Sequence, residues 1–100
     1  MTVLEIETIT EQFGDCALRA RKCGFYGVEI HGSHGYLLAE CMSPYANKRT
    51  DLYGGPLVNR LRLPLAVIKN IRGKCGDDLL LIIASPPMNS SPEAGFWKIP

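Results

Sequence analysis

Apolar residues recur at two different spacings along the chain, and the spacing changes from one segment to the next. Over Leu4–Cys23 they recur every three or four residues, which predicts an amphipathic helix. Thr2 with Glu5 three residues later forms a capping-box pattern at its start, and Gly24 is a suitable stop after its last turn. The same spacing predicts a second long helix over Val58–Lys74.

Two short apolar runs have the composition of strands. Tyr26–Ile30 carries β-branched residues at alternate positions, and Leu79–Ala84 is an unbroken apolar run, typical of a strand covered on both faces. Tyr36–Met42 has helical spacing over about two turns. The order helix, strand, loop, helix, strand predicts an α/β fold in which the two strands are parallel and adjacent.

One proline lies within the second predicted helix. Pro64 would cost ~3 kcal/mol in a helix interior, or kink the helix, unless the helix begins just before it. The preceding segment, residues 43–56, is rich in proline, glycine, asparagine and aspartate, and this composition predicts a loop.

Composition and charge narrow the function classes. The 100 residues include 11 basic and 10 acidic side chains, so the net charge of +1 gives no electrostatic case for nucleic acid or an anionic membrane. No apolar run approaches the ~18 residues of a membrane span, and no secretory signal pattern is present at the start. We therefore expect a cytoplasmic location. The four cysteines form no C-x-x-C pair, so neither a disulfide framework nor a zinc knuckle is expected.

Side chains that can donate hydrogen bonds or protons follow the first predicted strand. His31 comes directly after the strand, and His34 and Tyr36 lie within one short turn of it. In parallel α/β folds the reactive side chains sit at the carboxyl ends of strands. Imidazole N–H groups can hold a developing oxyanion, and a phenol can deliver a proton. This set suits the reduction of a double bond conjugated to a carbonyl, provided that a separate cofactor supplies hydride.

Two other interpretations of the histidines stay open on spacing alone. A histidine after a strand often does no more than hydrogen-bond a loop carbonyl. A metal site at H-x-x-H needs a third ligand, and only Glu29 or Glu40 is near in sequence. Glu29 should point to the face opposite its apolar neighbours in a regular strand, which disfavours the metal interpretation. We therefore expect no metal.

Several motifs together resemble one family. They are HGSHGYLL at residues 31–38, SPYANKRTD at residues 43–51, YGG at residues 53–55, and Asn59-Arg60. In this order they closely resemble the Old Yellow Enzyme family, and more narrowly its bacterial NADH:flavin oxidoreductase branch, which includes enoate and dienoyl-CoA reductases. We therefore assign residues 1–84 to a partial barrel segment and residues 85–100 to an irregular tail without the resemblance.

The resemblance implies an FMN-dependent (β/α)8 TIM barrel, of which this chain carries about two strand–helix units. In that family the flavin takes hydride from NAD(P)H and passes it to a small-molecule enone or enoyl substrate. His31 and His34 match the pair that binds the substrate carbonyl, and Tyr36 matches the proton donor. The residues that bind the flavin stay unassigned.

The resemblance also includes loop residues for which we expect a structural role. Asn47, Arg49, Asp51 and Arg60 should bind loop backbone and one another as a clamp, because a buried arginine rarely goes unpaired. Gly54-Gly55 should supply a turn that needs positive φ.

The sequence also departs from the family pattern. Ile83 stands where the family places an arginine against the flavin, and the motif resemblance stops after Pro86. The alternative function is therefore a truncated, non-catalytic remnant that folds only with a partner chain supplying the missing barrel.

Overall fold

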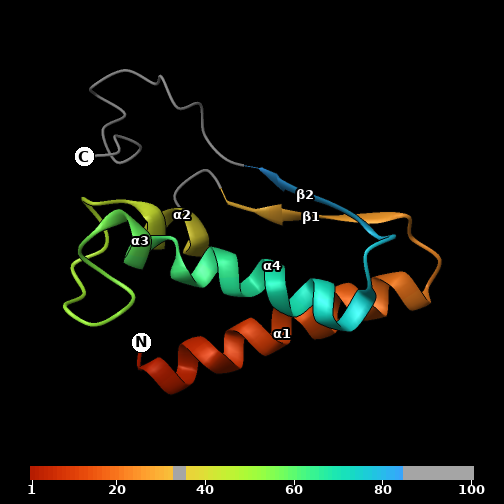
Figure 1. The fold of residues 1–100 in the computed structure, drawn as a ribbon, viewed down its shortest axis with the longest axis horizontal. Coiled ribbons are helices and arrows are strands. Elements are labelled where there is room, and N and C mark those ends of the chain that lie inside the picture. Colours follow the sequence, from red (N-terminus) through yellow and green to blue (C-terminus); the bar gives the residue numbers. More distant parts are fainter. Residues whose placement is uncertain (33–35, 85–100) are drawn as a thin grey trace. The chain divides into compact units, whose positions relative to one another are not determined.

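The computed structural model describes residues 1–32 and 36–84 (Figure 1). Its elements in chain order are α1 (Val3–Lys22), β1 (Gly27–His31), α2 (Leu37–Met42), α3 (Leu57–Arg60), α4 (Arg62–Cys75) and β2 (Leu80–Ala84). The chain divides into two compact units. The first unit comprises Met1–Ile30 and Leu65–Ile82, and the second comprises His31–Pro64 with the residues from Ile83 onward.

Helix α1 begins and ends where its local sequence predicts. The Thr2 hydroxyl accepts a hydrogen bond from the Glu5 N–H at 3.1 Å, and the Glu5 carboxylate accepts one from the Thr2 N–H at 2.9 Å. This reciprocal pair satisfies two of the free N–H groups at the helix start. At the other end, Gly24 follows the cap residue Cys23 with φ of +94°, a conformation that favours glycine. The predicted bounds are confirmed to within one residue.

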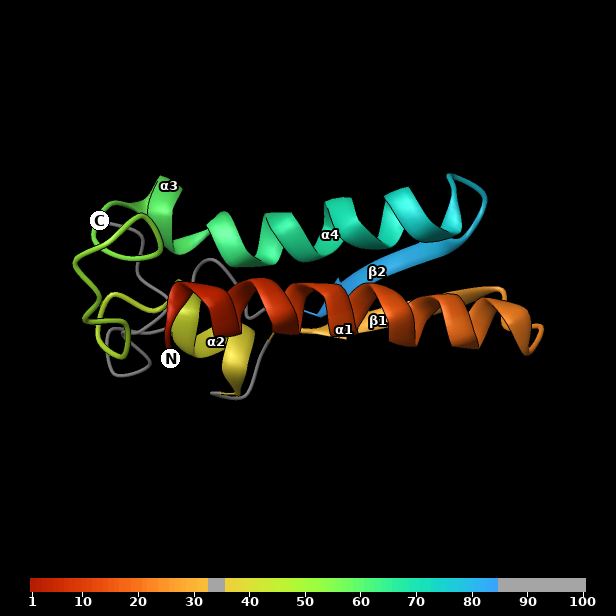
Figure 2. The same cartoon turned by 90° about the horizontal axis from the view of Figure 1, so that it is seen from below.

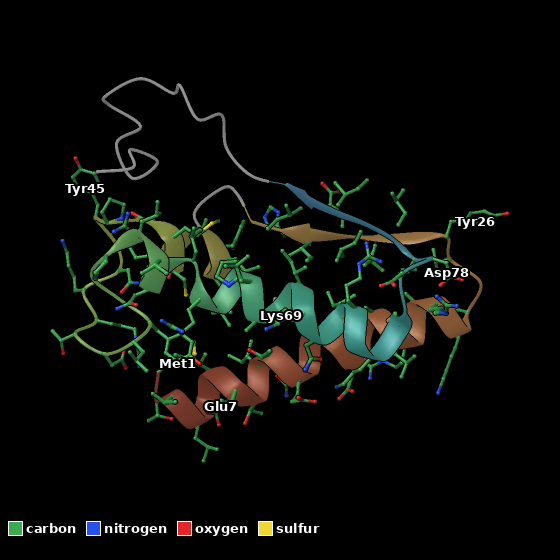
Figure 3. All side chains as sticks on the ribbon, in the orientation of Figure 1. Met1, Glu7, Tyr26, Tyr45, Lys69 and Asp78 are labelled. Carbon is green, nitrogen blue, oxygen red and sulfur yellow. The ribbon has the colours of Figure 1, made fainter. Side chains whose placement is uncertain are left out.

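Strands β1 and β2 are adjacent and parallel, as the alternation of elements predicts. The Leu80 N–H donates to the Tyr26 carbonyl at 2.9 Å, and the Gly32 N–H donates to the Ala84 carbonyl at 2.8 Å. Tyr26 itself, at the amino end of β1, is 92% exposed and points away from the first unit (Figure 3).

In the first unit, α1 and α4 lie side by side on one face of the sheet (Figures 1 and 2). The core between these helices and the strands is formed by Ile6, Ala17, Ile30, Val67, Ile71, Cys75 and Leu79, each at most 4% exposed. The other face of β2 is apolar as well, but Leu80 is 59% and Ile82 is 49% exposed. The apolar run of β2 predicts cover on both faces, and the described residues cover only one of them.

The predicted single helix over Val58–Lys74 is wrong, because the structure contains two helices there. Helix α3 ends at Arg60 and α4 begins at Arg62, with Leu61 between them. Pro64 is thus the third residue of α4, within the first turn, where a backbone N–H has no intrahelical partner in any case. The break removes the cost that Pro64 would have inside a continuous helix.

Charged side chains connect α1 to α4 on the outer side of the first unit. The Lys74 ammonium lies 2.7 Å from the Glu11 carboxylate and 2.6 Å from the Asp15 carboxylate. The Asn70 amide also donates to Glu11, at 2.9 Å. The hydrogen bonds from Lys74 hold the pKa values of Glu11 and Asp15 below their ordinary values, and the pKa of Lys74 is raised in return.

These pKa shifts determine whether acid stabilises or destabilises the fold. Both carboxyl groups have lower pKa values in the folded chain than in the unfolded chain. The network therefore stabilises the fold at pH values above the ordinary pKa values of these carboxyl groups. That stabilisation is lost as the pH falls through the folded values, below about pH 4. Lys74→Gln should return the Glu11 and Asp15 pKa values toward their ordinary range in an NMR titration, and Lys69→Gln on the same helix should not. Unchanged titration curves in Lys74→Gln would contradict the network.

None of the helices within residues 1–32 and 36–84 combines the length and the apolar character of a membrane span.

Candidate active site

His31 is the last residue of β1 and occupies the carboxyl end of that strand. Side chains alternate between faces along a strand. Ile30 is 3% exposed, whereas Glu29 and His31 are both exposed, so the histidine lies on the uncovered face. The alternation that predicts Glu29 opposite its apolar neighbours is confirmed.

Tyr36 lies next to His31 in the second unit. The two ring centroids are 5.2 Å apart with an interplanar angle of 44°, and the tyrosine is 63% exposed. His34, the third predicted site residue, lies outside the described residues. The structure therefore brings together two of the three predicted residues, an imidazole and a phenol, with both accessible to a small molecule.

Helix α2 carries Tyr36 at its start as the N-cap residue. Two residues of its first turn, Leu38 and Ala39, are each 1% exposed and fix the helix by burial. Ser43 follows the helix and is also 1% exposed, and its hydroxyl accepts from the Tyr45 and Ala46 N–H groups at 3.1 Å. Ser43 lies in one of the family motifs, but its capping role shows only in the structure, where the serine begins a turn.

The predicted clamp is present in the loop after α2. The Asn47 amide donates to the carbonyls of Cys41 at 2.7 Å and Tyr53 at 2.8 Å. Arg60 is 2% exposed and donates from Nε to the Met42 carbonyl at 3.0 Å. Its Nη1 donates to the Gly55 carbonyl at 2.5 Å. These bonds tie the loop to the end of α2, and the structural role expected for both residues is confirmed.

The remaining clamp residues pair with each other. Arg49 donates from Nε and Nη2 to the two carboxylate oxygens of Asp51, at 3.1 and 2.6 Å. The hydrogen bond from Arg49 is the main cause that lowers the pKa of Asp51, and the pKa of Arg49 is raised. Gly55 has φ of +90°, which confirms the predicted turn.

The carboxyl end of β2 lies beside the residue that follows His31. A Cβ atom at Gly32 would stand 2.7 Å from the Ala84 carbonyl and 3.3 Å from Ile83, so only glycine fits there. Ile83 and Ala84 add apolar surface and no cation. Of the residues 1–32 and 36–84, no group of three His, Cys, Asp or Glu side chains could hold a metal ion.

The donor set at these strand ends fits one side of a flavin site. An imidazole and a phenol can hydrogen-bond a carbonyl oxygen and supply a proton. A flavin phosphate needs cations or backbone N–H groups instead. Among the cations of the described loop, Arg49 pairs with Asp51, and Arg60 and Arg62 bind backbone carbonyls. Lys48 is exposed and makes one contact, with the Pro44 carbonyl at 3.5 Å. The described residues at the strand ends therefore fit the substrate side of the site.

A parallel strand–helix–strand segment with polar side chains at the carboxyl end of a strand is the repeating unit of an α/β barrel. The sequence model of the NADH:flavin oxidoreductase / NADH oxidase family matches residues 1–97, and the chain belongs to this family. The matched range extends past Pro86, after which the motif resemblance is expected to stop. Membership indicates FMN as the cofactor and NADH or NADPH as the electron donor.

Individual relatives agree with this assignment. The chain is 46% identical over 78 residues to an NADH oxidase of Thermoanaerobacter brockii, which covers 78% of this chain and 12% of the relative. It is 46% identical over 79 residues to a cinnamate reductase of Clostridium sporogenes, covering 78% of this chain and 12% of the relative. The solved complex of 2-naphthoyl-CoA reductase with 2-naphthoyl-CoA superposes with a TM-score of 0.81 at 40% identity, covering 83% of this chain and 13% of that chain.

This chain therefore spans about an eighth of the length of these relatives. The reductase in that complex has a TIM-barrel fold, and this chain has the fold of a fragment of such a barrel.

Proposed function

We propose that this chain supplies the substrate-binding and proton-donating segment of a flavin-dependent reductase. Its substrate would be a small molecule with a double bond conjugated to a carbonyl, and the electrons would come from NAD(P)H. His31 and His34 would bind the carbonyl oxygen, and Tyr36 would donate the proton. The observation that carries the proposal is the exposed His31–Tyr36 pair, with ring centroids 5.2 Å apart, at the carboxyl end of β1.

The chemistry of these residues supports the assignment. When bound, FMN supplies the hydride. As hydride reaches the β-carbon of the alkene, negative charge develops on the carbonyl oxygen, and an imidazole N–H from His31 can stabilise it. The α-carbon then needs a proton, and a phenol is a suitable general acid for that step. Cinnamate, the compound in the name of one relative, is an alkene conjugated to a carboxylate.

The carbonyl-binding role can be tested by ligand affinity. In a flavin-loaded barrel that carries this segment, His31→Ala should weaken binding of phenol by about 1–3 kcal/mol, because it removes a hydrogen-bond donor from the ligand oxygen. This loss corresponds to a Kd higher by roughly 5- to 150-fold, measured by titration of the flavin absorbance.

Glu29→Ala provides a matched control, because Glu29 lies two residues earlier on the same exposed face of β1. It should leave the affinity for phenol unchanged. Equal affinities in wild type and His31→Ala would remove His31 from the ligand site. Stoichiometric zinc that is lost on His34→Ala would support the metal interpretation instead.

The second candidate is a non-catalytic remnant that folds only beside a partner completing the barrel. The exposed apolar residues of β2, Leu80 at 59% and Ile82 at 49%, favour it, because apolar strand faces in parallel sheets are ordinarily covered. Alkene reduction in a flavin-loaded barrel that carries this segment separates the two candidates: turnover would favour the first, and a loaded barrel without turnover would favour the second.

A further inference from the structure

Helix α2 is short and its last carbonyls are held by side chains from outside the helix. It has only six residues, Leu37–Met42, and a helix of this length is marginal by itself. The last carbonyls of a helix have no intrahelical partner. Here the Cys41 carbonyl accepts from the Asn47 amide at 2.7 Å, and the Met42 carbonyl accepts from Arg60 Nε at 3.0 Å.

Arg60 suits this position for two reasons. Its cationic guanidinium lies at the negative end of the helix dipole, where positive charge is favoured. Its planar group also bridges two segments at once, because Nη1 donates to the Gly55 carbonyl while Nε binds Met42. Arg60 is 2% exposed and belongs to α3, which packs against α2.

Tyr36 lies at the opposite end of the same short helix. Its carbonyl accepts from the Glu40 N–H at 2.8 Å, and its side chain makes no capping bond of its own. The backbone of Tyr36 is therefore tied to the first turn of α2.

We propose that Arg60, together with Asn47, is a positioning residue for Tyr36. The clamp holds α2 by its carboxyl end and thereby keeps the phenol in register with the carbonyl held by His31. This inference rests on the proposed function, in which Tyr36 is the proton donor. A displacement of about 1 Å in such a group can lower a rate by roughly 100-fold, so the clamp acts on the reaction as well as on the fold.

A double-mutant cycle in the flavin-loaded holoprotein that carries these residues tests the inference. Stopped-flow absorbance would follow flavin reduction by NADH and flavin reoxidation by 2-cyclohexen-1-one separately. Arg60→Gln should lower the reoxidation rate by about 10-fold or more and change flavin reduction by less than about 2-fold. In a Tyr36→Phe background, Arg60→Gln should cause no further loss, because no phenol remains to be positioned.

Arg62→Gln is the matched control. Arg62 donates to the Leu52 carbonyl at 2.8 Å and to Asn59, and none of these contacts involves α2. Hydrogen exchange gives a readout besides activity. The Glu40 and Ser43 amides donate to the Tyr36 and Ala39 carbonyls. Both amides should exchange faster in Arg60→Gln than in wild type, and at the wild-type rate in Arg62→Gln.

The outcomes are distinguishable. If Tyr36→Phe slows reoxidation and Arg60→Gln multiplies that loss, Arg60 acts independently of Tyr36 and the positioning role is overturned. If Tyr36→Phe leaves reoxidation unchanged, the proposed function itself fails, and the positioning role fails with it. If Arg60→Gln gives no flavin-loaded protein, Asn47→Asp takes its place in the cycle, with Asn59→Asp as the control. The same comparison with Tyr36→Phe then supports or overturns the positioning role.

Discussion

Replacing Tyr36 by phenylalanine is expected to lower the rate of alkene reduction about 100-fold or more, because general acid catalysis typically contributes 10²- to 10⁴-fold. A 100-fold loss corresponds to about 2.7 kcal/mol of transition-state stabilisation. Flavin reduction by NADH should stay within about 2-fold of the wild-type rate, since hydride transfer to the flavin needs no proton from this phenol. The contrast between the two half-reactions is the expected signature of the proton donor.

Stopped-flow absorbance of the flavin measures both half-reactions in a barrel that carries this segment. Tyr45→Phe is the matched control, because Tyr45 belongs to the same unit, is 60% exposed and points outward (Figure 3). It should leave both rates unchanged. Equal slowing of both half-reactions by Tyr36→Phe would show that Tyr36 supports the flavin environment or the fold and does not act as the acid.

The purified 100-residue chain is expected to self-associate and to take up no FMN. Leu80, Ile82 and Ile83 are 59%, 49% and 36% exposed on a two-stranded sheet, and such a sheet is marginal in water unless its faces are covered. Exposed strand edges and apolar patches favour association between copies. Each loop arginine of the described residues already binds a carboxylate or a backbone carbonyl, which disfavours a role in holding the flavin phosphate.

Sedimentation velocity at several protein concentrations measures the association, and the flavin absorbance after dialysis against FMN measures uptake. Ile82→Thr should reduce association, because it removes apolar surface from the uncovered face while keeping a residue suited to strands. Leu65→Gln is the control, since Leu65 is 52% exposed on α4 and lies away from that face. A monomer with a sharp cooperative thermal transition, raised further by FMN, would contradict the expectation.

The parts of the fold that depend on near neighbours follow from the sequence. The start and stop of α1 are set by Thr2, Glu5 and Gly24, which act within one turn of the helix. The order of helices and strands follows from the period of the apolar residues. His31 and Tyr36 are five residues apart at the end of a strand, so their proximity follows once that strand is placed. The clamp follows from the loop arginines, because a buried arginine rarely goes unpaired.

Other features depend on contacts between residues far apart in the chain. The break at Leu61 does not show in the periodicity, because the apolar spacing continues through it. Arg60, just before the break, donates to Met42 eighteen positions earlier, and the spacing of apolar residues carries no information about such a bond. The burial of Ser43 is likewise decided by how the loop closes.

The sequence by itself therefore determined the family and the order of helices and strands, and it supplied the residues proposed for catalysis. Only the tertiary structure decided which side chains hold the last carbonyls of α2 and which face of β2 is covered. The physical reason is that caps and periodicity are local properties of the chain. A buried guanidinium bond such as that of Arg60, or a covered strand face, exists only when distant segments meet.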